Sequence, residues 1–167
     1  HLQNDPHRPR FHFVSPEGRC YPFDPNGAIF WKGRYHLFYI VQIKDKGHCW
    51  GHASSIDLLH WRFHPIALMP GDGAGGIFSG CALVNREGVP TIVYLGTNTG
   101  MCVATSGDDE LIRWQKDPRN PVIPIPRDGD PGYGRYAVHD PHVWLEGDVY
   151  YAILNSRRGA LPEEKWD

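Results

Sequence analysis

The sequence predicts an all-β fold of the propeller type, and three observations support this prediction. Among 167 residues there are 19 Gly and 15 Pro, and 13% are aromatic, a composition typical of short strands joined by many turns. Three stretches share one hairpin pattern. A second pattern, which ends on Trp, follows the first two of these stretches at a spacing typical of propeller blades.

The hairpin pattern is an apolar run, a turn that contains Gly, and a second run rich in β-branched and aromatic residues. It occurs over residues 27–40, 80–95 and 141–154. The predicted turns are Lys32-Gly33-Arg34, Arg86-Glu87-Gly88 and Glu146-Gly147-Asp148. Turns of this kind between two such runs indicate antiparallel pairing, and nothing in the sequence indicates a competing helix.

The second pattern predicts the outer half of a blade. One copy contains Ala53-Ser54-Ser55, Asp57 and Trp61, and the other contains Ala104-Thr105-Ser106, Asp109 and Trp114. The two Ala residues are 51 positions apart (104 minus 53) and the two Trp residues are 53 apart (114 minus 61). Two hairpins in each period of about 50 residues correspond to one four-stranded blade.

These repeats divide the chain into blades. Blade 1 is expected over about 27–68, blade 2 over about 80–125, and the start of blade 3 over about 139–156. Residues 1–167 then form the N-terminal half of a propeller domain, with the ring incomplete. Because residues 117–131 are rich in Pro, Gly and Asp, we expect them to form a long surface connection.

Composition excludes several other functions. The net charge is −2 and no long basic run occurs, so the sequence lacks the basic patch typical of nucleic-acid-binding proteins. No apolar stretch approaches the ~20 residues of a membrane helix. The four Cys form no CxxC pair, and the pairs His48/His52 and His60/His64 lack a partner that completes a metal-ligand spacing. We expect no cofactor and no metal. No signal peptide is recognised, which leaves the compartment open.

Two acidic residues precede inner strands at equivalent places in the repeat. Asp24-Pro25-Asn26-Gly27 stands ahead of the first inner strand and His139-Asp140-Pro141 ahead of the third, whereas blade 2 has Phe78-Ser79-Gly80 there. When that motif is taken alone, a turn capped by the Asp side chain is the better explanation of Asp24. However, the first strand of each propeller blade lines the central channel, and converging carboxylates are what glycoside hydrolysis needs.

The ordered motifs resemble glycoside hydrolase family 32, the invertase and levanase family. The likeness runs from Arg8-Pro9-Arg10-Phe11-His12-Phe13 through Asp24-Pro25-Asn26-Gly27, residues 31–39, Trp50-Gly51-His52-Ala53-Ser54-Ser55 and Phe78-Ser79-Gly80 to Asp140-Pro141. The resemblance implies a five-bladed propeller in which Asp24 attacks the anomeric carbon and Asp140 stabilises the transition state. It also implies that Asn26, Trp50, Phe78 and Ser79 line the sugar subsite, where the Trp50 indole could stack on a sugar ring.

The sequence departs from the family pattern in three places. Tyr21-Pro22-Phe23 stands where the family has Trp-Met-Asn, and His139 stands where it has Arg. Ile40 replaces a Gln, while Gln42 lies two residues further on the same strand face. We therefore count Gln42 and His139 among the candidate substrate-binding residues.

The resemblance also implies a Glu acid/base about one blade beyond Asp140, past Asp167. The sequence thus predicts a retaining β-fructosidase that binds a carbohydrate substrate, with the 167-residue chain alone inactive. Two alternatives stay open. One is a propeller that binds carbohydrate without cleaving it, and the other is a half-propeller that self-associates because its ring is incomplete.

Overall fold

The structure is a computed structural model that describes residue 13 and residues 21–71 and 73–155. Its described part is all-β, as predicted, and is built of antiparallel sheets. It contains no helix with the length and apolarity that crossing a bilayer requires.

The described strands form three sheets. In the first sheet the order is β1 (Tyr21–Trp31), β2 (Arg34–Ile43), β3 (Gly47–Ser55) and β4 (Arg62–Phe63). In the second the order is β5 (Ile77–Val84), β6 (Pro90–Gly96), β7 (Gly100–Thr105) and β8 (Gln115–Lys116), with β9 (Ile123–Pro124) also pairing with β7. The third consists of β10 (His139–Glu146) and β11 (Val149–Asn155). Each hairpin turns where the sequence predicted.

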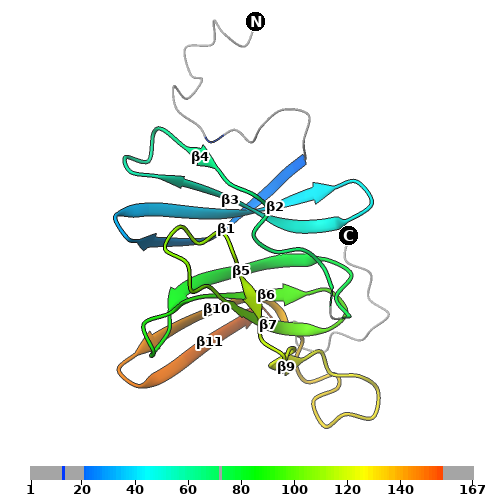
Figure 1. Cartoon of the computed structure of the whole chain (residues 1–167). Helices are drawn as coiled ribbons and strands as arrows, with labels where there is room; N and C mark the ends of the chain where they lie inside the picture. The colour runs from blue at the N-terminus through cyan, green and yellow to red at the C-terminus, as the bar shows by residue number, and fades with distance from the viewer. Residues whose placement is uncertain (1–12, 14–20, 72, 156–167) are drawn as a thin grey trace, which may run out of the picture.

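The three sheets are stacked in chain order, with the second in the middle (Figure 1). Strand β6 is buried along its whole length. Its alternate side chains point to opposite faces, and each face packs against a neighbouring sheet. Ile92 and Tyr94 pack toward the first sheet against Phe38 and Trp50. Val93 lies between them in sequence and packs toward the third sheet, in a cluster with Leu95 and Val143. Two hydrophobic layers therefore hold the three sheets together.

The outer-strand pattern is a turn that an Asp carboxylate and a Trp indole stabilise in both copies. Asp57 accepts hydrogen bonds from the backbone N–H groups of Leu59 and His60, and the Trp61 indole donates to the Leu58 carbonyl. In the second copy the Trp114 indole donates to the Leu111 carbonyl in the same way. Leu58 and Leu111 both have positive φ, so the two turns share a backbone conformation.

Asp108, not Asp109, is the counterpart of Asp57. Its carboxylate accepts hydrogen bonds from the backbone N–H groups of Glu110, Ile112 and Arg113. Asp109 instead lies at the surface, 3.8 Å from the Lys32 Nζ. The sequence pattern, which included Asp109 in the second copy, was therefore wrong by one position, because the second turn is longer.

Residues 117–131 are not purely a surface connection. Within them β9 pairs with β7, with Met101 opposite Ile123. A second feature is the exposure of Tyr151 on β11. Tyr151 is 44% exposed, whereas Phe38 is fully buried, because β11 has no further sheet over its outer face in the described structure.

Candidate active site

The three motif segments lie on the first strand of each sheet, and each forms an irregularity in that strand. The β1–β2 register shifts between Pro22 and Pro25, which leaves Asp24 unpaired. The β5–β6 register shifts at Ser79, and the β10–β11 register shifts across Asp140 and Pro141. Bulges are frequent beside active sites because the unpaired residue can turn its side chain away from the regular alternation.

Contacts between neighbouring inner strands place these irregularities at a similar level. Strands β1 and β10 both pack against β5. The Gly80 N–H donates to Asn26 Oδ1 at 3.1 Å on one side of β5. On its other side the Val143 N–H lies 3.1 Å from the Cys81 Sγ. One to three residues back along each strand from these contacts lie Asp24, Ser79 and Asp140.

Asp24 and Asp140 are both exposed, as groups that act on a ligand must be. Asp140 has φ +42, an uncommon conformation for a residue with a side chain. Such strain is characteristic of functional sites. The next residue, Pro141, is fully buried, so the carboxylate projects from a firmly packed backbone.

His139 stands beside Asp140, at the position where the family has Arg. Its Nδ1 lies 3.1 Å from the Asp140 Oδ2. Both side chains remain partly exposed, at 32% and 44%. A charged contact to this carboxylate therefore exists only when the imidazole is protonated, whereas Arg would be charged at every pH.

Asn26 and Trp50 contact the second sheet. The Asn26 carboxamide accepts from the Gly80 N–H and donates from Nδ2 to the Asp24 carbonyl at 3.1 Å. The Trp50 indole donates to the Phe78 carbonyl at 3.0 Å. Because Trp50 is fully buried and packs against Phe38, the expectation that its ring is open for stacking on a sugar is wrong for this structure.

Phe78 and Ser79 are half-buried, and the Phe78 ring meets the His48 ring edge to face with centroids 5.0 Å apart. Gln42 pairs with His48 across β2 and β3. Gln42 is exposed, in contrast to the buried Ile40 two residues earlier. The structure thus brings His48, which the sequence did not suggest for this site, beside Phe78.

A row of histidines lies elsewhere, at the boundary between the first two sheets. The His36 Nδ1 and His52 Nε2 are 2.9 Å apart, and the His52 and His64 rings are stacked with centroids 4.3 Å apart. Burial lowers the pKa of His36 to about 4 and that of His52 to about 2. Within residues 13, 21–71 and 73–155 no group of His, Cys, Asp or Glu is placed to hold a metal ion.

The cysteines carry no disulfide in the described structure. Cys49, Cys81 and Cys102 are buried free thiols, and burial raises the pKa of each. Such thiols are unreactive packing groups. Cys20 lies outside the described residues, as do residues 8–12 of the matching N-terminal motif.

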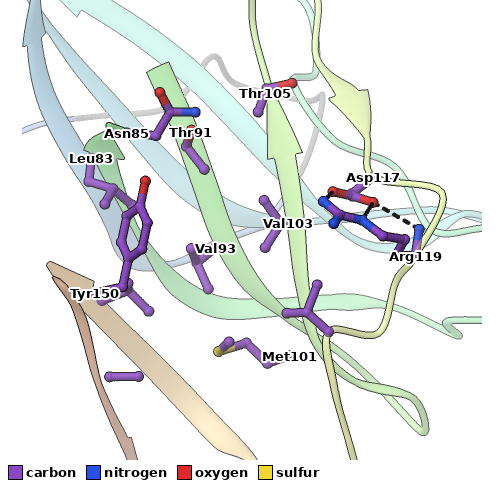
Figure 2. Close-up of a pocket in the computed structure, with 13 residues that line it drawn as sticks. Leu83, Asn85, Thr91, Val93, Met101, Val103, Thr105, Asp117, Arg119 and Tyr150 are labelled. Atoms are coloured by element: carbon purple, nitrogen blue, oxygen red, sulfur yellow. Dashed lines mark hydrogen bonds and ion pairs between the residues drawn. The ribbon is translucent and has the colours of Figure 1, made fainter. Parts of the chain in front are cut away.

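A hollow of about 390 Å³ lies between the second and third sheets (Figure 2). Its floor is apolar and includes Val93, Met101 and Val103, with the ion pair of Asp117 and Arg119 at its rim. None of the candidate site residues lines it. It adjoins the two-stranded third sheet, and we do not assign it to the active site.

The sequence matches the model of a known protein family. Residues 12–163 match the model of the glycosyl hydrolases family 32 N-terminal domain. The chain belongs to glycoside hydrolase family 32. The motifs from Asp24 to Asp140 all fall inside the matched range.

Similar curated proteins are bacterial and plant enzymes. A sucrose-6-phosphate hydrolase of Salmonella typhimurium is 39% identical over 166 residues, an alignment that covers 92% of this chain and 33% of that protein. A raffinose invertase of Escherichia coli is 34% identical and covers 89% of this chain and 32% of that protein. A sucrose:sucrose 1-fructosyltransferase of Festuca arundinacea is 37% identical, with coverage of 90% and 24%. The chain spans about a third or less of the length of these relatives.

Solved structures agree on the fold. Fructan 1-exohydrolase IIa from Cichorium intybus superimposes with a TM-score of 0.71 at 28% identity, covering 89% of this chain and 29% of that one. A β-fructofuranosidase of family 32 from Bombyx mori gives a TM-score of 0.69 at 32% identity, with coverage of 89% and 32%. The three stacked sheets therefore correspond to part of a family 32 propeller, which confirms the predicted fold class.

Proposed function

We propose that this chain is the N-terminal part of a catalytic domain that hydrolyses β-fructosides such as sucrose with retention of configuration. The observation that carries the proposal is the placement of Asp24 and Asp140. Both are exposed carboxylates at irregularities of inner strands that flank β5. The names of the similar proteins, which include sucrose-6-phosphate hydrolases and a sucrose:sucrose 1-fructosyltransferase, support this substrate class.

Asp24 acts as the nucleophile in this proposal. Its carboxylate attacks the anomeric carbon of the fructosyl unit, the bond to the leaving-group oxygen breaks, and that oxygen takes a proton from a second carboxyl group. Water then attacks the covalent fructosyl ester and gives a proton to the second carboxylate, which restores both Asp24 and the acid. We propose that the proton-donating carboxyl is contributed from outside residues 1–167.

Asp140 holds sugar hydroxyls and stabilises the positive charge that develops on the sugar ring. Gln42, Phe78, Ser79 and His139 contribute the remaining surface of the subsite. Trp50 supports the subsite through its hydrogen bond to the Phe78 carbonyl. Without the proton donor the leaving group departs unassisted, and we expect the chain alone to be slower by about 10²–10⁴-fold from this cause.

The test is Asp24→Asn in the polypeptide that carries residues 1–167 together with the acid/base carboxyl. We expect sucrose hydrolysis to fall by about 10³-fold or more, because loss of the attacking group stops covalent catalysis. Release of glucose measures the rate, and far-UV circular dichroism checks the fold. Asp128→Asn, at an exposed aspartate of the 125–137 loop, is the matched control. Sucrose turnover at the normal rate in the Asp24 variant contradicts the assignment.

A second candidate function is binding without cleavage. It is favoured by the His139–Asp140 pair, since an imidazole stands where the family pattern has Arg beside the carboxylate proposed to stabilise the transition state. Calorimetric titration with sucrose and with fructan oligosaccharides separates the two functions. Heat of binding with no sugar released by the complete polypeptide supports the binding protein, and turnover excludes it.

A further inference from the structure

The Asp24-Pro25-Asn26-Gly27 motif contains a residue whose polar atoms face protein on both sides. Asn26 is only 9% exposed. Its Nδ2 donates to the Asp24 carbonyl and its Oδ1 accepts from the Gly80 N–H, each at 3.1 Å. We call this set of two hydrogen bonds the Asn26 bridge. It joins the backbone of the proposed nucleophile to the neighbouring inner strand.

Close backbone approach accompanies the Asn26 bridge. A Cβ atom on Gly27 would lie 2.7 Å from the Ala82 nitrogen and 2.8 Å from its Cβ. A Cβ on Gly80 would collide with the Val93 carbonyl oxygen. Both glycines therefore allow strand contacts that no side chain would permit, and the contact of Gly27 with β5 brings Asn26 within reach of Gly80.

The segment that Asn26 holds is the one that carries Ser79. The Gly80 N–H is bound by Asn26 from β1, while the Phe78 carbonyl accepts from the Trp50 indole of β3. Ser79 lies between these two anchored residues and is itself unpaired in the β5–β6 register. Two side chains of the first sheet thus fix the irregularity of the second.

We propose that Asn26 is a positioning residue that sets the placement of Asp24 relative to Ser79, instead of contacting the sugar. The proposal rests on the proposed function, in which both residues face the substrate. An amide is suited to this role because it offers a donor to the Asp24 carbonyl and an acceptor to the Gly80 N–H at once. Asp offers no donor, and Leu offers neither.

The experiment uses the 167-residue chain and nuclear magnetic resonance. We compare the wild type with Asn26→Leu and Asn26→Asp by the hydrogen-exchange rate of the Gly80 amide and by the amide shifts of Asp24 and Ser79. The control is Ile92→Val, which removes one methyl group from the core between the first two sheets. It reproduces a loss of thermal stability without touching the Asn26 bridge.

We expect Asn26→Leu to accelerate exchange of the Gly80 amide more than tenfold and to shift the Asp24 and Ser79 amides together. Asn26→Asp keeps the acceptor, so Gly80 stays protected within about threefold while the Asp24 amide shifts. Ile92→Val leaves all three amides unchanged. Unchanged Gly80 exchange in Asn26→Leu, or equal effects in Ile92→Val, overturns the proposal.

Titration with fructose then connects the Asn26 bridge to the sugar subsite. We expect fructose to shift the Asp24 and Ser79 amides of the wild type, and its affinity to fall at least fivefold in both Asn26 variants but not in Ile92→Val. Wild-type affinity in both variants overturns the positioning role. Absence of fructose binding by the wild-type chain counts against the proposed function, and the exchange data still decide whether the bridge exists.

Discussion

At the scale of single residues, the site depends on a few positions where the backbone departs from regular pairing. Asp24, Ser79 and Asp140 are unpaired in their sheets, and Asp140 has a positive φ. The sequence indicated Asp24 and Asp140 as candidate site residues, because Asp-Pro recurs at equivalent places in the repeat. It could not indicate the bulges, since these arise from hydrogen bonds between strands distant from each motif.

Gly27 gives a residue-scale prediction about stability. In Gly27→Ala the added methyl group would lie 2.9 Å or less from backbone atoms of Cys81 and Ala82, and the two sheets must move apart to accept it. We expect a loss of about 1–3 kcal/mol in the free energy of unfolding, measured by urea titration.

Gly107→Ala is the control, because a Cβ there meets nothing within 4 Å. We expect its effect to stay within about 0.5 kcal/mol. Equal stability of the two variants would show that the close contact between β1 and β5 is not required.

At the scale of elements, the first two sheets enclose His36, His52 and His64, whose rings follow one another across β2, β3 and the residue after β4. The Ser54 hydroxyl lies 2.8 Å from the His64 Nε2 and accepts from the Arg34 Nε. Asp108 and Glu110, which lie between β7 and β8, interact electrostatically with this row. The sequence showed spaced histidines but not that β-strand pairing would stack them.

This row predicts acid sensitivity. The pKa of His36 falls from 6.5 to about 4 on folding, chiefly through burial, so between these values the unfolded chain binds a proton that the folded chain does not. The contribution of His36 therefore leaves the free energy of unfolding at its full value above pH 6.5 and lowers it as the pH falls toward 4. For His36 the loss is at most about 3 kcal/mol.

Urea titrations at pH 7.5, 6.5, 5.5 and 4.5 measure this decline, in a range above the titration of most carboxylates. His52→Phe keeps an aromatic ring beside Phe38 and should flatten the profile. The control is His142→Gln at an exposed position, which should keep the wild-type slope. An unchanged slope in His52→Phe contradicts the proposed origin of the acid sensitivity.

At the scale of the whole molecule, the described structure has two open ends. Phe30 is 58% exposed on the first sheet, while Val149, Tyr151 and Ile153 are 53%, 44% and 62% exposed on β11. Strand β11 also pairs only with β10 within the described residues. Exposed apolar edge strands favour association.

We therefore predict that the 167-residue chain self-associates as its concentration rises. Size-exclusion chromatography with light scattering should give a mass above the 19.0 kDa of one chain. Ile153→Lys on β11 should shift the population toward the monomer, whereas Lys44→Ala, at an exposed loop position, should not. A monomer at every concentration contradicts the prediction.

The sequence by itself determined the all-β class, the three hairpins and their turns, and the chain order of the motifs from Asp24 to Asp140. These features are local, because turn residues and alternation act over a few neighbouring positions. Membership of family 32 followed from the same ordered motifs.

Only the tertiary structure decided what each motif residue contacts. It buried the Trp50 ring in the core, turned the Asn26 carboxamide toward Gly80, and paired β9 with β7 inside a stretch that looked like a loop. The first two outcomes depend on packing between the first and second sheets, and the third depends on strand pairing within the second sheet. The sequence pattern of one blade does not specify the surface of the neighbouring blade against which it packs.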